Sequence, residues 1–402
     1  MRRSTTVIAL VLVMLCGAAL QAQDKIDGDG FVLRNQLSPS ATPLLEGLTA
    51  AAFNDTGKAE KLLPPLIAKA PNSQAAAQAR EALMFLDFRQ GAYRQALHWV
   101  DLALATSPGD AKLRGLRVLL DGLTRHPDQH ATTTPSSAAA HLREGNIFVA
   151  VHANKQSGEY ILDSGANISV ISESEARRLG MKIESSEGST PLTGAAGGNF
   201  SYRLATLDRL EIGRATLRNV AFLVVSDDSL PFAELPKGQR AILGIPVLLG
   251  LRTIRLRPMG EQMEIGFDSQ PLKYIEANLC FDSAYPLLLA RFQQKELYLS
   301  LDTGGAHSDL YSRFRDSFAA YVATHGHKGN WRQRGVDGSK QIESTDLDEV
   351  ALNIGGRMLL LRPAHIIDEP RDSPLQGRLG MDALSQAKTL TFDWGAMRLL
   401  LE

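Results

Sequence analysis

The stretch YILDSGANISVIS, residues 160–172, decides how this sequence is interpreted. It places Asp163 at the end of an apolar strand, directly before Ser164-Gly165, where a tight turn is expected. A carboxylate on such a turn suggests one half of a site in which two carboxyl groups share a proton. One carboxylate cannot perform this chemistry alone, so a second motif must lie further along this chain or in another copy of it.

A second motif lies further along this chain, because its β-rich part is duplicated. Residues 146–165 (NIFVAVHANKQSGEYILDSG) align with residues 285–304 (YPLLLARFQQKELYLSLDTG), and both blocks end in Asp-Ser/Thr-Gly. Three more pairs of blocks recur in the same order: 207–225 with 347–367, 241–250 with 377–386, and 252–267 with 388–402. Apolar and β-branched residues alternate within these blocks, with glycine-bearing turns between them, which predicts strands. We therefore expect two similar all-β halves.

Each half also carries an apolar segment that ends in glycine at a matching distance from its aspartate. Gly244 follows Asp163 by 81 residues, and Gly380 follows Asp302 by 78 residues. The paired motifs resemble those of the aspartic protease superfamily, in particular its compact retropepsin-like bacterial members. The resemblance covers about two thirds of the chain and implies a bilobed pepsin/retropepsin-like fold. The expected lobes are residues 143–270 and 271–402.

The resemblance implies that Asp163 and Asp302 are the catalytic pair. Two carboxyl groups about 3 Å apart cannot both ionise, so the pKa of one rises and the pair shares a proton. In the family, a water held between the two groups attacks the peptide carbonyl, so we expect neither a cofactor nor a metal. The hydroxyl groups of Ser164 and Thr303 can hydrogen-bond from one turn to the other. The residues expected to support the two turns are Ser164, Gly165, Ala166, Leu243, Gly244, Thr303, Gly304, Gly305, Leu379 and Gly380.

Two glycine-bearing hairpins are expected to cover the substrate cleft as flaps. The segment GSTPLTGAAGGNFSY (188–202) lies at the spacing of a retropepsin-like flap, and HGHKGNWRQRGVDGSKQ (325–341) is the matching part of the second half. Backbone groups of a glycine-rich tip can pair with an extended peptide. A plain hairpin loop is the alternative for each segment. The expected substrate-binding residues are Gly194, Ala195, Gly197, Gly198 and Trp331.

Gly305 departs from the family pattern, which usually has Ser, Thr or Ala at this position. Glycine there predicts a more flexible second turn. An alternative interpretation is therefore a catalytically degenerate bilobed fold that serves as a peptide-binding or scaffold protein. A third interpretation is an enzyme whose lobes pair between chains. Pairing within one chain, which we expect, predicts an active monomer.

Residues 40–125 are rich in Ala and Leu with helical periodicity, which predicts an all-α region. The segment RQGAYRQALHWVDLALATSP (89–108) resembles the second half of a tetratricopeptide repeat, with a weaker echo 37 residues upstream. The residues at repeat positions are Gly91, Tyr93, Ala96, Val100, Ala103 and Pro108. Docking of a protein partner and a role as a helical spacer both stay open for this region. Residues 126–142, rich in Pro, Ser, Thr and Ala, are expected to form a linker.

Residues 1–22 have the features of a cleaved export signal. Arg2 and Arg3 precede an uncharged, mostly apolar run at 7–20, which is shorter than the roughly 20 residues of a spanning helix. We therefore expect export, a periplasmic location and no stable membrane insertion. The net charge of −1 gives no support for nucleic-acid binding. Removal of the signal leaves Cys280 as the only cysteine, which excludes an internal disulfide.

The sequence thus predicts a multidomain protein with tetratricopeptide-like helical hairpins followed by an all-β, bilobed aspartic protease fold. Its expected activity is that of an aspartic endopeptidase acting on exported or periplasmic polypeptides.

Overall fold

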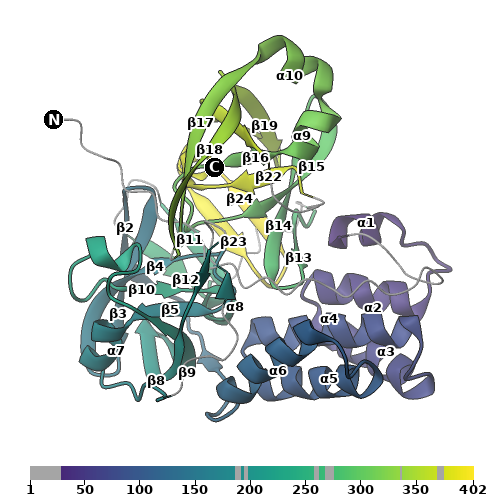
Figure 1. The fold of residues 1–402 in the computed structure, drawn as a ribbon, viewed down its shortest axis with the longest axis vertical. Coiled ribbons are helices and arrows are strands. Elements are labelled where there is room, and N and C mark those ends of the chain that lie inside the picture. Colours follow the sequence, from purple (N-terminus) through teal and green to yellow (C-terminus); the bar gives the residue numbers. More distant parts are fainter. Residues whose placement is uncertain are drawn as a thin grey trace.

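The computed structural model describes residues 29–185, 192–193, 198–257, 262–267, 276–335, 337–368 and 375–402. Figure 1 shows a group of helices at the N-terminal end, a first β-rich lobe beside it, and a second β-rich lobe above both. This arrangement confirms the predicted fold class, an all-α region followed by a bilobed all-β region. The predicted export signal lies outside the described residues.

Helical hairpins form the N-terminal region, as the periodicity predicts. Asp55 and Ser73 accept hydrogen bonds from the first turns of α3 and α4, and Gly91 ends α4 in the left-handed conformation at φ 75°. α2 packs against α3, and α4 against α5. No helix among the described residues has both the length and the hydropathy needed to cross a membrane. The helices are α1 (Gly30–Asn35), α2 (Pro43–Ala52), α3 (Thr56–Lys69), α4 (Gln74–Gln90), α5 (Tyr93–Thr106) and α6 (Ala111–Leu123).

The two lobes are built from strands with a few short helices. Lobe 1 contains β3 (Asn146–Ala153), β4 (Gln156–Leu162), β5 (Ser169–Ser172), α7 (Glu173–Arg178), β6 (Leu192–Thr193), β7 (Asn199–Phe200), β8 (Arg203–Ile212), β9 (Ala215–Val225), the 3₁₀ turn η1 (Phe232–Glu234), β10 (Ala241–Leu243) and α8 (Ile245–Leu251). Lobe 2 contains β13 (Leu279–Asp282), β14 (Tyr285–Phe292), β15 (Lys295–Leu301), β16 (Asp309–Tyr311), α9 (Ser312–Ser317), α10 (Ala319–His325), β17 (Gly326–Gly335), β18 (Gly338–Leu347), β19 (Val350–Ile354), β20 (Arg357–Leu361), β21 (Ala364–Ile367), β22 (Gly377–Leu379) and α11 (Met381–Leu384).

Both lobes repeat one pattern of strand pairing. In lobe 1, β10 lies between β4, to which it is parallel, and β5, to which it is antiparallel. In lobe 2, β22 lies between β15 and β16 with the same directions. β5 continues in parallel with β9, as β16 does with β21. The duplication seen in the sequence is therefore present in the fold, and it places Asp163 and Asp302 at equivalent strand ends.

A sheet shared by the lobes joins them. Its strand order is β2-β12-β11-β23-β24, and the antiparallel pairing of β11 with β23 crosses from one half of the chain to the other. The strands are β2 (Ser136–Arg143), β11 (Thr253–Leu256), β12 (Gln262–Ile265), β23 (Leu390–Asp393) and β24 (Arg398–Leu401). Because backbone hydrogen bonds run through this sheet, both lobes belong to one folded unit.

The segment 126–142, predicted to be a linker, contains regular structure. β1 (His130–Thr132) pairs with β9, and β2 pairs with β3 and with β12. Ala138 and Ala140 of β2 are buried while their neighbours Ser137 and Ala139 are exposed. Side chains as small as these carry little hydropathy contrast, so the alternation of a half-buried strand was not visible in the composition.

The helices pack against both lobes. α4 contacts α8 of lobe 1, whereas α1 and α2 contact β13 of lobe 2. Arg89 of α4 is buried at this boundary and donates hydrogen bonds to the carbonyl oxygens of Ala51 (2.8 Å) and Ser283 (2.6 Å). Cys280 of β13 is buried too. The helical region and the lobes thus share a packed interior.

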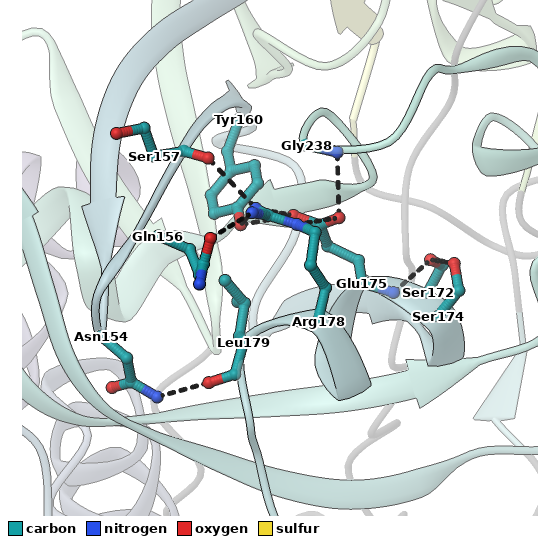
Figure 2. A network of polar contacts seen from close by, with 10 residues as sticks. All are labelled: Asn154, Gln156, Ser157, Tyr160, Ser172, Ser174, Glu175, Arg178, Leu179 and Gly238. Carbon is teal, nitrogen blue, oxygen red and sulfur yellow. Dashed lines mark hydrogen bonds and ion pairs between the residues drawn. The ribbon is translucent and has the colours of Figure 1, made fainter.

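A buried polar network fixes α7 against the strand that leads to Asp163 (Figure 2). The Glu175 carboxylate accepts hydrogen bonds from the Tyr160 hydroxyl (2.7 Å), the Arg178 guanidinium (2.6 Å) and the Gly238 N–H (3.0 Å). Burial alone would raise the pKa of Glu175, but these hydrogen bonds lower it overall. Tyr160 lies three residues before Asp163, so the network anchors β4 close to the turn.

Candidate active site

Two similar turns carry the predicted catalytic residues. Asp163 follows β4 and Asp302 follows β15, and the two residues are 0% and 1% exposed. The Asp163 Oδ1 atom accepts the Gly165 N–H (2.7 Å), while the Asp302 Oδ1 atom accepts the N–H groups of Gly304 (3.0 Å) and Gly305 (2.8 Å). Each turn therefore orients its own carboxyl group through the backbone of the glycine motif.

Ser164 and Thr303 link the two turns, as predicted. The Ser164 N–H donates to Thr303 Oγ1 (2.9 Å), and the Thr303 N–H donates to Ser164 Oγ (3.0 Å). Each hydroxyl then donates to the carbonyl oxygen at the end of the opposite strand, Ser164 to Leu301 and Thr303 to Leu162, both at 2.9 Å. These four buried hydrogen bonds bring both turns of one chain together.

The carboxyl group of Asp163 lies directly against the partner turn. A Cβ atom added at Gly304 would lie 2.2 Å from Asp163 Cγ, so only glycine fits there. The Asp163 Oδ2 atom is buried and accepts no hydrogen bond from the described residues. The carboxyl groups of Asp163 and Asp302 interact with each other in this buried site.

The apolar-glycine segments support the turns from below. The Asp163 N–H donates to the Leu243 carbonyl oxygen and the Asp302 N–H to that of Leu379, both at 3.0 Å. After each glycine, the first N–H of the following helix donates back to the turn, to Ala166 in lobe 1 (2.8 Å) and to Gly305 in lobe 2 (2.7 Å). The structure therefore brings together all ten residues predicted to support the turns.

The electrostatic environments of the two carboxyl groups differ. Burial raises the pKa of Asp163, and the neighbouring Asp302 raises it further. Burial also raises the pKa of Asp302, but the Arg378 guanidinium opposes that rise. Because the groups interact, they titrate as a pair rather than independently.

Arg378 and Asp309 were missed by the sequence interpretation. Arg378 Nη1 lies 3.2 Å from Asp302 Oδ2, and its Nη2 forms a short ion pair with Asp309. Burial alone would lower the pKa of Arg378, but the two carboxylates raise it overall, so the guanidinium stays charged. An available signal was the residue type itself, since arginine occupies the first position of a segment that should be apolar-apolar-Gly.

Of the predicted flap residues, Gly198 and Trp331 are described, whereas Gly194, Ala195 and Gly197 lie outside the described residues. Gly198, directly before β7, donates its N–H to Asp337 Oδ2 at the turn between β17 and β18 (2.5 Å). Arg334 of β17 forms an ion pair with Glu234 of lobe 1 (2.7 Å). Hairpins from the two lobes therefore contact one another.

Trp331 of β17 lies between two histidine rings. Its ring stacks on His365 with centroids 4.3 Å apart and meets the edge of His307 at 5.5 Å. His307 follows Asp302 by five residues, so Trp331 packs beside the second turn. Among the described residues, no group of three or more His, Cys, Asp or Glu side chains could hold a metal ion.

Comparison with known proteins agrees with this geometry for the first lobe. Residues 149–251 match the family model described as aspartyl protease. The match runs from β3 to α8 and contains Asp163, Ser164 and Gly244. The match supports a protease-type function for the chain.

Two solved structures of aspartic proteases are similar at low identity. The retropepsin-like aspartic protease from Rickettsia conorii is 17% identical, covering 35% of this chain and 96% of that chain with a TM-score of 0.25. The aspartic proteinase from Irpex lacteus is 15% identical, covering 66% of this chain and 96% of that chain with a TM-score of 0.43. No curated protein sequence matches the chain.

Proposed function

We propose that this protein is an aspartic endopeptidase in which Asp163 and Asp302 activate a water between them. The observation that carries the proposal is the joining of two buried carboxyl turns by the reciprocal hydrogen bonds of Ser164 and Thr303. Two carboxyl groups in such a site share one proton, which provides a base and an acid at the same time. The match of residues 149–251 to the aspartyl protease family supports the same reaction class.

The proposed reaction needs only these two groups and water. The ionised carboxylate takes a proton from the water as its oxygen attacks the peptide carbonyl carbon. The protonated carboxyl group donates its proton to the carbonyl oxygen, which yields a tetrahedral diol. The diol then collapses: the carboxyl group that took the proton from water donates it to the leaving nitrogen, the carbon–nitrogen bond breaks, and a diol hydroxyl group gives its proton to the other carboxylate. No cofactor takes part.

The test is cleavage of an unfolded polypeptide by the purified full chain at several values between pH 3 and pH 8. Asp163→Asn and Asp302→Asn should each abolish cleavage while circular dichroism shows an unchanged fold. Asp101→Asn is a matched control, because Asp101 is exposed on α5 and pairs only with Arg117 among the ion pairs of the described residues. Wild-type activity in either active-site variant would overturn the proposal.

A peptide-binding protein without catalysis is the second candidate function. The ion pair between Arg378 and Asp302 favours it, because a carboxylate beside a cation is a weaker base. This candidate predicts tight binding of a peptide, no turnover, and the same affinity in Asp163→Asn and Asp302→Asn. The cleavage experiment therefore separates the two functions.

We also propose that the enzyme is exported to the periplasm and acts there on polypeptides as a monomer. The basic start and apolar run of residues 1–22 support export. The pairing of both turns within one chain supports a monomer. Cell fractionation with mass measurement of the mature chain tests the first point, and the solution mass of the active protein tests the second. Docking of a protein partner on the helices rests on the repeat resemblance alone.

A further inference from the structure

Lobe 2 carries a charged pair where lobe 1 carries an apolar pair. Val170 faces Ile242 across β5 and β10, and the equivalent register across β16 and β22 pairs Asp309 with Arg378. All four side chains are buried. A buried arginine is tolerated only where a carboxylate compensates its charge. Because lobe 2 differs from lobe 1 at both positions, we treat Asp309 and Arg378 as one unit.

A third difference lies in the turn itself. A Cβ atom at Gly305 would lie 2.5 Å from Asp302 Oδ2, whereas Ala166 has its methyl group at the equivalent place in lobe 1. Gly305 also donates its N–H to Asp302 Oδ1 and accepts a hydrogen bond from the Met381 N–H. The glycine is therefore firmly bonded, and its missing side chain leaves room for the Asp302 carboxyl group to reach Arg378.

The charges around this unit favour an ionised Asp302. Arg378 contacts Asp302 and Asp309 simultaneously, and buried charges at this distance are weakly screened by solvent. Among the ion pairs of the described residues, Asp302 takes part in one with Arg378 and Asp163 in none, and Asp302 is the charged group that acts on Asp163. The other charged or titratable groups that act on the unit are Tyr311 on Arg378, and Asp382 and His365 on Asp309.

We propose that Arg378, held by Asp309 and given access by Gly305, is a positioning residue that fixes Asp302 as the ionised member of the pair. In the proposed peptidase reaction, on which this inference rests, Asp302 takes the proton from water and Asp163 carries the proton that passes to the substrate carbonyl oxygen. The unit thus assigns the base and the acid to particular residues.

The test copies the lobe 1 arrangement into lobe 2 with the triple variant Gly305→Ala, Asp309→Val and Arg378→Ile. Carbon-13 labelling of the aspartate carboxyl groups allows each group to be followed by nuclear magnetic resonance as the pH changes, with Asp163→Asn and Asp302→Asn providing the assignments. In the wild type, Asp302 should lose its proton at lower pH than Asp163. In the triple variant, the midpoint of Asp302 should rise by about one pH unit or more, a tenfold change in its ionisation equilibrium.

A control removes another arginine–carboxylate pair, in which the carboxylate is buried and the arginine is partly exposed. Arg178→Met with Glu175→Gln does so in lobe 1 and should leave the titration order of the pair unchanged, although it lowers stability. Arg378→Lys retains a cation, so Asp302 should still lose its proton before Asp163. The difference between the two midpoints should be smaller than in the wild type. An unchanged order and separation in the triple variant would overturn the proposal.

Two further measurements keep the outcome decisive. If the triple variant does not fold, Gly305→Ala alone should displace Asp302 Oδ2 and raise the midpoint of Asp302 in the same direction; an unaltered midpoint refutes the role of the unit. In an active enzyme, the acidic limb of the pH profile of kcat should move to higher pH with the Asp302 midpoint. The titration can be measured without turnover. An inactive protein in which Asp302 still loses its proton at lower pH than Asp163 would refute the peptidase function but support Asp302 as the ionised member of the pair.

Discussion

Ser164 and Thr303 are joined by a reciprocal pair of hydrogen bonds, in which each backbone N–H donates to the hydroxyl oxygen of the other residue. This relationship spans the boundary between lobes and is buried from solvent. The site consequently depends on contacts between residues 139 positions apart in the chain. Disturbing either hydroxyl should affect the stability of the whole β-rich region as well as the geometry of the carboxyl pair.

Thr303→Val retains the side-chain shape but removes the hydroxyl group. The Ser164 N–H then loses its acceptor, and a buried donor without a partner costs about 1–3 kcal/mol. We expect the free energy of unfolding in urea to fall by that amount and cleavage to weaken. Thr324→Val is the control, because the Thr324 hydroxyl group bonds to a backbone carbonyl oxygen on the exposed face of α10. This substitution should change the free energy of unfolding by less than about 0.5 kcal/mol. Equal losses in both variants would contradict the role of Thr303.

Stability should depend on pH through Asp163. Burial and the neighbouring Asp302 raise the pKa of Asp163 above its ordinary value of 3.8. The folded protein then binds this proton more tightly than the unfolded chain, so the stabilisation is complete below the ordinary pKa and is lost as the pH rises through the raised pKa. Relative to Asp163→Asn, the wild type should lose unfolding free energy in urea titrations as the pH rises from the ordinary value of 3.8 through the raised pKa. Parallel pH dependences would rule this out.

Glu175→Gln should show the opposite pH dependence. The pKa of Glu175 is lowered in the folded protein, because hydrogen bonds from Arg178, Tyr160 and Gly238 outweigh the effect of burial. Its stabilisation is therefore present above the ordinary pKa and is lost as the pH falls through the lowered pKa. We expect the variant to lose about 1–3 kcal/mol at pH 7 and less in strong acid. Glu173→Gln, on the same helix but more exposed, is the comparison and should cost less.

The ion pair between Arg334 and Glu234 should affect activity more than stability. Exposed pairs contribute about 0.2–1 kcal/mol, but this pair connects the lobe 2 hairpin that carries Trp331 to lobe 1. Arg334→Glu should lower kcat/KM up to about fivefold, the equivalent of roughly 1 kcal/mol. The charge-swapped variant with Glu234→Arg should recover most of that loss. Failure of the swap to restore activity would show that the contact does not position the hairpin.

The carboxyl pair and its supports could be predicted from the sequence because each depends on a local motif that occurs twice. Asp163 and Asp302 were identified by their turns, and Leu243 and Leu379 by their distance from those turns. The hydrogen bonds of Ser164 and Thr303 also followed, because each motif carries a hydroxyl group that can bond to the opposite turn.

Arg378 and Asp309 could not be assigned in the same way. Their significance depends on which residues face one another across β16 and β22, and that register is fixed only by the folded sheet. Gly305 was interpreted as a sign of flexibility. The space that its missing side chain leaves for Asp302 Oδ2 can be recognised only when the position of that atom is known. The strands within residues 126–142 were missed because alanine and serine give a weak alternation of hydropathy.

The pairing of Asp309 with Arg378 occurs in lobe 2 only, because the equivalent register in lobe 1 holds Val170 and Ile242. In a symmetric dimer of identical lobes, every substitution appears on both sides of the two-fold axis, so an arginine beside one carboxyl group would also lie beside the other. The arginines would then favour the ionised form of both aspartates, and neither carboxyl group would hold the proton that the acid must donate. A single chain that carries both lobes is free of that constraint, so Arg378 can lie beside Asp302 while Asp163 has no such neighbour.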